Sequence, residues 1–402
     1  MRIGIVGTSW PYRGGLAAFN ERLARQFMAE GHEVEIFTFT LQYPDFLFPG
    51  KTQYSDAPKP ASLKIRRTVN SINPFSWFKT ARQIQKAGIE LVVLKFWIPL
   101  MAPCLGSIAR LLRRKGIRVV AVLDNVIPHE PHFWDKWLIR YFIRSIDRFV
   151  AMSESVRQDC LRFLPASRTG DVALTPHPLY DNFGEAVDKI QARKDLCLPQ
   201  DKTILLFFGF IRDYKGLDLL MRAYARTITN PQSPLPNHPS PITNNQSPIT
   251  NPLLLVVAGE FYNNAQQYGE LEKELGLEGR IIWHTSFIPD DRVRYYFSAA
   301  DLIVQPYKSA TQSGVTQIAY HFGKPMLVTD VGGLAEIVPN GKVGYVCEVS
   351  EDSVSDAIRR FASMEPEERE KTFAHNIQEE KAKYAWSKMT DVILNDQMVN
   401  GK

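Results

Sequence analysis

The stretch that decides the fold is "FFGFIRDYKGLDLL", residues 207–220. An apolar run leads into Gly209, two cations follow at Arg212 and Lys215, and an amphipathic helical pattern begins after Gly216. Strand, loop and helix in this order are typical of one unit of a parallel α/β sheet. Because open sheets of this kind bind ligands at the carboxyl ends of their strands, we expect the two cations to lie at a binding edge.

An anion is the ligand that this loop favours. The start of a helix offers free N–H groups and a partial positive charge. Arginine binds two oxygens at once, and lysine adds a mobile point charge. Arg212 and Lys215 therefore predict a diphosphate site, and a solvated loop with two ordinary cations is the alternative.

The alternation of strands and helices runs through the chain in two series. A stretch with two prolines, residues 171–183, interrupts it, and we place a domain boundary near residues 176–184. The predicted fold class is α/β, with two doubly wound Rossmann-like domains at residues 1–178 and 179–375. The predicted strands lie at residues 2–7, 33–39, 90–96, 117–123 and 148–153, and then at 202–210, 253–260, 280–284, 301–307, 324–330 and 343–348.

Composition limits the function classes. The 402 residues carry a net charge of +5, which suits anionic ligands or an anionic membrane face and does not require nucleic acid. The four cysteines are far apart in sequence, so we expect a reducing compartment without a disulfide framework or a zinc site. The first residues enter a strand directly, which argues against a signal or transit peptide, and Lys95 interrupts the longest apolar run.

One segment has almost no apolar residues. Residues 229–251, "TNPQSPLPNHPSPITNNQSPITN", are rich in Pro, Asn and Ser and contain "SPIT" twice. Such a composition cannot form a core, so we predict a disordered insertion within the second domain.

Three other glycine-containing loops also precede predicted helices. They are "RGGLAAF" with Gly14 and Gly15, "SGVTQIAYHF" with Ser313 and Gly314, and "VGGLAEIV" at residues 331–338. Glycine lets a ligand approach backbone N–H groups, although each loop taken alone is more often a simple turn. None matches G-x-G-x-x-G, so the dinucleotide fingerprint is absent.

Together these motifs resemble the retaining glycosyltransferases of family 4, which have the GT-B fold. The resemblance covers nearly the whole chain, and it is most specific in "RGGLAAF", "FFGFIRDYKGLDLL", "VVAGE", "FIPDDRVRYYFSAADLIVQPY" and "GKPMLVTDVGGLAEIVPNGKVGYV". It implies two Rossmann-like domains facing a central cleft, with the acceptor bound mainly by the first domain and the donor by the second. It also implies that a C-terminal helix within residues 376–402 crosses back to the first domain.

The resemblance assigns roles to individual residues. It implies that Arg212 and Lys215 hold the donor diphosphate and that Glu260 and Phe287 lie near the nucleotide base. Backbone N–H groups around Ser313 would meet the sugar or phosphate. The residues it assigns to the donor are Gly14, Gly15, Arg212, Lys215, Glu260, Phe287, Gln312, Ser313, Gly314, Val315 and Gln317.

The chain departs from the family at one important point. Members usually carry two glutamates with seven residues between them, where our alignment places Ala310 and Ile318. Gln312 and Gln317 lie nearby and can form hydrogen bonds, but an amide lacks the negative charge that stabilises an oxocarbenium ion. A catalytically degenerate nucleotide-sugar binding homologue, or a partner subunit, is therefore the alternative function. A sugar-nucleotide epimerase is a third, which the family motifs disfavour.

The acceptor side is predicted from "VLDNVIPHEPHFWDKW" in the first domain. Asp124 and His129 follow the strand at residues 117–123, and either side chain could orient or deprotonate an acceptor hydroxyl. We treat both as candidate catalytic residues. A polar loop with a capping aspartate is the alternative, and in a retaining mechanism the departing phosphate can itself take the proton.

Aromatic and basic residues alternate in the first domain. Trp77, Trp134, Trp137, Arg113 and Arg114 suit an anionic membrane interface, and the alternative is that the aromatics are core residues.

The resulting expectation is a retaining hexosyltransferase of cell-envelope polysaccharide synthesis. Its partners would be a nucleotide-diphosphate sugar and a glycan or lipid-linked acceptor, and it would be cytoplasmic, with possible peripheral contact on the inner face of the membrane. No metal or other cofactor is expected, because no DxD-like carboxylate pair lies in the relevant loops. No nucleic acid is expected as a partner.

Overall fold

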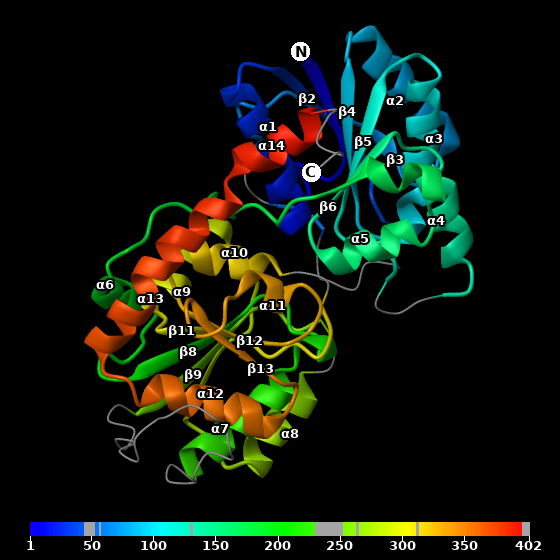
Figure 1. Cartoon of the computed structure of the whole chain (residues 1–402). Coiled ribbons are helices and arrows are strands. Elements are labelled where there is room, and N and C mark those ends of the chain that lie inside the picture. The colour runs from blue at the N-terminus through cyan, green and yellow to red at the C-terminus, as the bar shows by residue number, and fades with distance from the viewer. Residues whose placement is uncertain are drawn as a thin grey trace. The chain divides into compact units, whose positions relative to one another are not determined.

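The computed structural model describes residues 1–43, 53–55, 58–128, 132–229, 252–262, 265–310 and 313–395. His129, Gln312 and, apart from Thr229, the predicted insertion at 229–251 lie outside these described residues. The chain divides into two compact units (Figure 1). Unit 1 comprises Met1–Pro178 and Ala385–Lys402, and unit 2 comprises Leu179–Tyr384.

Unit 1 is built on a seven-stranded parallel sheet in the order β3-β2-β1-β4-β5-β6-β7. The strands are nearly continuous apolar runs, as expected when helices cover both faces of a sheet. In the register of the central strands, Ile5 pairs with Ile36 on one side and with Val93 on the other. The strands are β1 Arg2–Val6, β2 Glu33–Leu41, β3 Ile65–Asn70, β4 Leu91–Phe96, β5 Arg118–Leu123, β6 Arg148–Ala151 and β7 Val172–Leu174.

Helices connect these strands and bury their apolar faces on the sheet. Asn73 caps one of them by accepting a hydrogen bond from the Phe75 N–H, and Pro74 occupies the first helical position, where no N–H is needed. The helices of the N-terminal part are α1 Gly15–Ala29, α2 Pro74–Lys86, η2 Pro99–Met101, α3 Ala102–Arg113, α4 Asp135–Ile143, α5 Glu154–Leu161 and η3 Ala166–Asp171.

The last helix, α14 (Trp386–Leu394), belongs to unit 1. The Trp386 ring packs on Phe19 of α1 with centroids 5.1 Å apart, and the Thr390 hydroxyl donates to Glu30 at 2.7 Å. At the other end of α14, the Arg118 guanidinium donates to the Leu394 carbonyl at 3.0 Å. The C-terminal segment is therefore part of the hydrophobic and polar packing of unit 1, although it follows unit 2 in sequence.

Unit 2 contains a six-stranded parallel sheet in the order β10-β9-β8-β11-β12-β13. Its strands are β8 Thr203–Phe208, β9 Leu253–Ala258, β10 Ile281–His284, β11 Leu302–Gln305, β12 Met326–Thr329 and β13 Gly344–Cys347. Its helices are α6 Lys189–Asp195, η4 Asp213–Lys215, α7 Leu217–Thr229, α8 Gln266–Glu274, α9 Asp290–Ala299, α10 Gly314–His321, α11 Leu334–Ile337, α12 Glu351–Ala362, α13 Pro366–Lys381 and η5 Ala382–Tyr384.

The strand order fixes where a ligand would bind. In unit 2 the chain proceeds outward from β8 through β9 to β10, and then returns to the other side of β8 with β11. The connections that follow β8 and β11 therefore cross to opposite sides of the sheet, and the carboxyl ends of such a strand pair are the usual ligand position in doubly wound sheets. Strands β1 and β4 form the equivalent switch point in unit 1.

The predicted strands all appear, and two further strands were not predicted. Strand β3, "IRRTVN", carries two arginines because it lies at the edge of the sheet, where side chains reach solvent. Strand β7 has only three residues and precedes the prolines that suggested a break. Among the residues that the structure describes, no helix is long and apolar enough to cross a membrane.

Candidate functional site

The loop after β8 is shaped by glycines. Gly209 and Gly216 adopt positive φ angles of 96° and 68°, which side chains rarely allow. A Cβ atom at Gly216 would lie 2.0 Å from the Pro306 carbonyl oxygen, so only glycine lets this loop meet the chain that leaves β11. The Ile211 N–H donates to the Glu260 carbonyl at 2.9 Å, which ties the loop to the end of β9 as well.

The Lys215 side chain folds back over the end of β8, the strand that precedes its loop. A Cβ atom built on Gly209 would lie 3.2 Å from the Lys215 Nζ. The same Nζ is 5.7 Å from the centroid of the Tyr307 ring. Burial, with a smaller contribution from Arg212, lowers the pKa of Lys215 to about 7. No carboxylate in the described part of the chain contributes to this shift. The lysine is therefore a desolvated cation placed beside a second cation.

The Arg212 guanidinium lies over an aromatic ring. Its Cζ lies 3.6 Å from the centroid of Tyr262, a cation–π arrangement. The Tyr262 N–H in turn donates to the Ile211 carbonyl at 3.0 Å. Phe210 occupies the position directly after the glycine.

Helix α10 begins beside the same loop. Ser313 is its N-cap and accepts a hydrogen bond from the Val315 N–H at 3.2 Å, and a Val315 methyl lies 3.9 Å from the place of a Cβ on Gly209. A Cβ on Gly314 would lie 2.6 Å from the Tyr180 ring, so this glycine also has a packing role. The cap already occupies the Val315 N–H, and a ligand that used this donor would have to share or replace the bond.

Two buried glutamines stand near these strand ends without hydrogen-bond partners. Gln317 on α10 is 0% exposed and Gln305 at the end of β11 is 1% exposed, and neither side-chain amide has a partner among the described residues. Buried polar groups are usually paired, so these amides are unusual. Sequence reasoning identified Gln317 but missed Gln305, because a glutamine that ends an apolar strand gives no distinct signal.

The remaining predicted donor residues lie at the same edge of the sheet or outside the described residues. Glu260 follows β9 and is buried, and Phe287 follows β10 and is half-buried. Of Ala310 and Ile318, where the sequence resemblance predicts that the family's two glutamates would lie, Ile318 is buried on α10. The structure thus brings together the ends of β8, β9, β10 and β11, as expected for strands that are neighbours in one parallel sheet.

In unit 1 the glycine pair begins α1. Gly14 is the N-cap residue with a φ of 100°, and no other atom lies within 4 Å of a Cβ built on it. A substitution at Gly14 would therefore be opposed by the backbone conformation and not by packing. Gly15 is the first residue of the helix.

A buried ion pair lies beneath this helix. Lys95 of β4 is buried, and its Nζ is 2.8 Å from Asp124 Oδ1 at the end of β5 and 3.3 Å from the centroid of the Phe19 ring. Burial lowers the pKa of Lys95, although Asp124 opposes this shift. Sequence reasoning singled out Asp124 and used Lys95 only as an argument against a membrane span. The signal it missed is a lysine in the middle of a buried strand.

His177 completes this group. Its ring packs edge-on against Phe19, and its Nδ1 lies 2.7 Å from the Pro178 carbonyl oxygen. Burial first and Lys95 second lower the pKa of His177 to about 3, so the ring stays neutral at physiological pH. His132, in the predicted acceptor loop, is instead exposed and stacks on Trp134.

Comparison with known proteins agrees with this architecture. The family model "Glycosyl transferases group 1" matches residues 188–380, and the model "Glycosyltransferase Family 4" matches residues 13–176. The chain belongs to the family 4 glycosyltransferases. Its fold is GT-B, as the sequence motifs predicted.

The relatives of this glycosyltransferase are distant. N-acetyl-alpha-D-glucosaminyl L-malate synthase of Bacillus anthracis is 24% identical over 396 residues, which cover 94% of this chain and 91% of that protein. D-inositol 3-phosphate glycosyltransferase 1 of Catenulispora acidiphila is 28% identical over 63% of this chain, and the match spans 57% of that relative.

Solved structures match over almost the whole chain. Sucrose-phosphate synthase of Thermosynechococcus elongatus superposes with a TM-score of 0.72 at 18% identity, covering 98% of each chain. HepE of Anabaena in complex with UDP gives a TM-score of 0.70 at 14% identity, also over 98% of each chain. At these identities the likeness establishes the fold.

The described part of the glycosyltransferase contains no group of three or more His, Cys, Asp or Glu side chains placed to hold a metal ion. The β8 loop carries Arg212 and Lys215, and the N-terminus of α10 adds its partial charge. This arrangement is chemically suited to binding a polyanion.

The Lys95–Asp124 pair leads to a stability prediction. Asp124→Asn should lower the free energy of unfolding by about 3 kcal/mol, because it leaves a buried ammonium without its counter-charge. The double variant Lys95→Met/Asp124→Asn should recover much of the loss. Urea unfolding followed by circular dichroism measures both, and a single variant as stable as the parent would contradict the structure.

Gln317 leads to a second prediction. Gln317→Met conserves volume and removes an unpaired buried amide, so it should stabilise the ligand-free protein by about 1 kcal/mol. Gln305→Met is the matched variant and should act in the same direction. Thermal unfolding measures the change, and a lower melting temperature for both would mean that these amides have partners.

Proposed function

We propose that the protein is a retaining hexosyltransferase. It moves a sugar from a nucleotide-diphosphate donor to a hydroxyl of a glycan or lipid-linked acceptor in the synthesis of cell-envelope polysaccharide. The observation that carries the proposal is the β8 loop, where Lys215 is desolvated next to Arg212 and to the start of α10. Unit 2 would bind the donor and unit 1 the acceptor.

Related structures support a nucleotide-diphosphate donor. HepE of Anabaena is described in complexes with UDP and with UDP-glucose, and another structural neighbour is a lipopolysaccharide outer core galactosyltransferase. These ligands and activities belong to those proteins. They indicate which donor class to test first.

The proposed chemistry is electrostatic. When the bond from the anomeric carbon to the diphosphate breaks, negative charge grows on the leaving oxygen. Arg212 can bind two phosphate oxygens through its planar guanidinium, and Lys215 adds a point charge that is poorly solvated before the donor arrives. Both groups are preorganised, so they stabilise this charge with little rearrangement.

The acceptor proton has two possible destinations. Asp124 is ion-paired with Lys95 and also lies at the carboxyl end of β5, the ligand edge of unit 1. The departing phosphate can take the proton instead, as the resemblance to the family allows. We propose Asp124 as a positioning group for the acceptor, held in place by Lys95.

The test is a transfer assay with the purified protein. Lys215→Ala should reduce turnover of the donor at least 100-fold, since a missing oxyanion contact costs about this much. Lys273→Ala, which changes an exposed lysine on α8, is the matched control and should leave the rate unchanged. Proton NMR of the product reports the anomeric configuration. Near-normal rates with Lys215→Ala would refute the proposed site.

A second function is favoured by one observation. Ala310 and Ile318 stand where the family has glutamates, so the charge that usually faces the reacting sugar is missing. A nucleotide-sugar binding protein without catalysis, acting with a partner subunit, would have the same cationic loop. Tight UDP binding, weakened in Lys215→Ala, together with no transfer or donor hydrolysis would favour this second function.

The membrane part of the proposal rests on exposed aromatics in unit 1. Helix α3 packs against both α2 and α4, and the three lie side by side in Figure 1. Phe75 on α2 is 84% exposed and Trp137 on α4 is 64% exposed. The exposed apolar residues on and beside these helices are Ile72, Phe75, Phe78, Leu100, Phe133, Trp134 and Trp137, and exposed Lys79, Lys136 and Arg140 accompany them.

Aromatic side chains with nearby cations are typical of contacts with anionic lipid surfaces. Trp77, one of the predicted interface residues, is instead half-buried, and its indole N–H donates to the Asn70 carbonyl at 2.7 Å. We therefore assign the proposed contact to the exposed set on α2 and α4. The protein would bind peripherally to the inner face of the membrane, where lipid-linked acceptors are available.

A vesicle assay checks this surface. Phe75→Ser/Trp137→Ser should reduce co-sedimentation with vesicles of phosphatidylglycerol and phosphatidylcholine at least tenfold, because it removes two exposed apolar anchors. Ile190→Ser changes an exposed apolar residue of unit 2 and should have no effect. Equal binding of all three proteins would exclude this surface as the membrane contact.

A further inference from the structure

Unit 2 has a second cationic feature at the opposite edge of its sheet. A cavity of about 650 Å³ lies at the amino ends of β8, β11 and β12, and its lining includes Thr203, Asp301 and Pro325. Each of these residues begins one of these strands or directly precedes it. Strand β8 runs for six residues, roughly 20 Å, between this cavity and the loop of Arg212 and Lys215. The two features are therefore separate sites.

The lining has an excess of positive charge. Five cationic side chains contribute to it, against three acidic ones, which leaves a formal charge of +2. The cations are Lys189, Arg193, Lys202, Lys324 and Arg369, and the acids are Asp201, Asp301 and Glu370. The cations come from α6, α13 and the loops before β8 and β12, so the fold gathers them from distant parts of the sequence.

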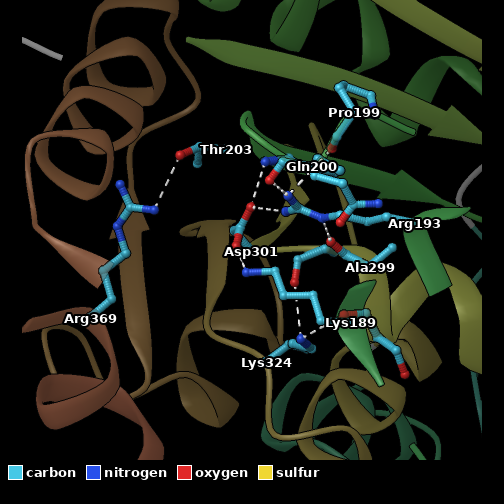
Figure 2. A network of polar contacts seen from close by, with 12 residues as sticks. Lys189, Arg193, Pro199, Gln200, Thr203, Ala299, Asp301, Lys324 and Arg369 are labelled. Carbon is cyan, nitrogen blue, oxygen red and sulfur yellow. Dashed lines mark hydrogen bonds and ion pairs between the residues drawn. The ribbon is translucent and has the colours of Figure 1, made fainter. Parts of the chain in front are cut away.

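Asp301 already has its partners. Figure 2 shows it between Arg193 and Lys189, with the Arg193 Nη2 at 2.7 Å. The Ile204 N–H donates to the same carboxylate at 2.7 Å. Burial alone would raise the pKa of Asp301, but the positive charges of Lys189 and Arg193 hold this pKa below its ordinary value. This carboxylate is thus committed to fixing α6 and the start of β8.

Arg369 forms no ion pair within 4 Å with a carboxylate of the described residues, although Asp301, Glu365 and Glu368 oppose the lowering of its pKa by burial. It projects from α13 towards Thr203 (Figure 2), and its Nη1 donates to the Thr203 hydroxyl at 3.3 Å. Its Nη2 donates to the Ala362 carbonyl at 3.1 Å. The side chain is only 9% exposed, and its Nε–H has no partner among the described residues. A buried guanidinium donor left unused is costly, and an anion in the cavity would satisfy it.

Lys324 and Lys202 add positive charge to the lining, and neither forms an ion pair with a carboxylate among the described residues. The Lys324 Nζ donates to the Ser298 and Ala300 carbonyls at 3.1 Å and 3.0 Å, which leaves one ammonium hydrogen. Burial is the main reason that the pKa of Lys324 falls to about 8. Lys202 is partly exposed, and no carboxylate within the described ranges forms an ion pair with it.

The cavity also has an apolar wall. Phe361 and Phe373 line it, and both are buried. Its volume falls in the range of sites for small organic ligands and is larger than a bare ion needs. A ligand that matches these features has a compact dianionic group and a small organic body.

We propose that this cavity binds a small phosphomonoester, with the phosphate among Lys202, Lys324 and Arg369 and the organic part against Phe361 and Phe373. A phosphomonoester dianion balances the formal charge, and its oxygens match the fork of a guanidinium. The site lies at the edge opposite the proposed donor loop, so it would hold an effector or a second ligand and not the transferred sugar.

The experiment is isothermal titration of the full chain with glucose 6-phosphate and glycerol 3-phosphate, in the presence of saturating UDP. Glucose and inorganic sulfate are the comparison ligands. The variants are Lys202→Glu, which reverses the charge of a partly exposed residue, and Arg369→Lys, which keeps the positive charge but removes the paired N–H donors of the guanidinium. Lys273→Glu makes the same change of net charge as Lys202→Glu on the exposed face of α8.

We expect a phosphomonoester to bind with a Kd below about 1 mM and at least tenfold more tightly than sulfate. Lys202→Glu and Arg369→Lys should each weaken binding about tenfold or more, while Lys273→Glu and Lys215→Ala should not. UDP binding should be weakened by Lys215→Ala and unchanged in Lys202→Glu and Arg369→Lys. Failure of the phosphomonoester site and failure of the donor site can therefore be told apart. Absence of phosphomonoester binding, or equal loss in Lys273→Glu or Lys215→Ala, would overturn the proposal.

Discussion

The account depends on a desolvated lysine at the end of a buried strand. Lys215 is half-buried, folded over Gly209 and adjacent to another cation, and burial first and Arg212 second lower its pKa to about 7. An anion that arrives at this position opposes this shift, because opposite charge favours the ammonium form. The ligand-free loop is therefore preorganised for a polyanion at the expense of its own electrostatic stability.

The rest of unit 2 keeps this loop in place. Gly216 permits close contact with Pro306, the end of β9 fixes Ile211, and Tyr262 supports Arg212. The sheet order places these elements side by side, since β9 and β11 flank β8. At the other edge of the sheet, Asp301 ties α6 to the start of β8, and Arg369 and Lys324 line a cavity. One parallel sheet thus presents positive charge at both of its ends.

Much of the fold could be read from the sequence because parallel strands are apolar runs followed by glycine and a helix. This pattern placed β8, the loop with Arg212 and Lys215, and the cap of α10 at one edge of the sheet. It failed for β3 and β7, because an edge strand with arginines and a three-residue strand lack the apolar run.

The side-chain pairing was not predictable from the sequence. Lys95 looked like a disruption of an apolar run, yet it is buried against Phe19 and paired with Asp124, which lies 29 positions later. The amino-edge cavity was missed for a similar reason, since its cations come from residues 189 to 369 and meet only in the fold. Local patterns report elements and loops, whereas these contacts join distant segments.

Proton uptake on donor binding shows whether Lys215 meets the donor anion. Calorimetric titration with UDP in buffers of different ionisation enthalpy, at pH 6 and at pH 8.5, counts the protons taken up. Lys215 is mostly charged at pH 6 and mostly neutral at pH 8.5, so wild type should take up about one more proton than Lys215→Met at pH 8.5 and little more at pH 6. Tight UDP binding with the same proton count in both proteins at pH 8.5 would contradict the account.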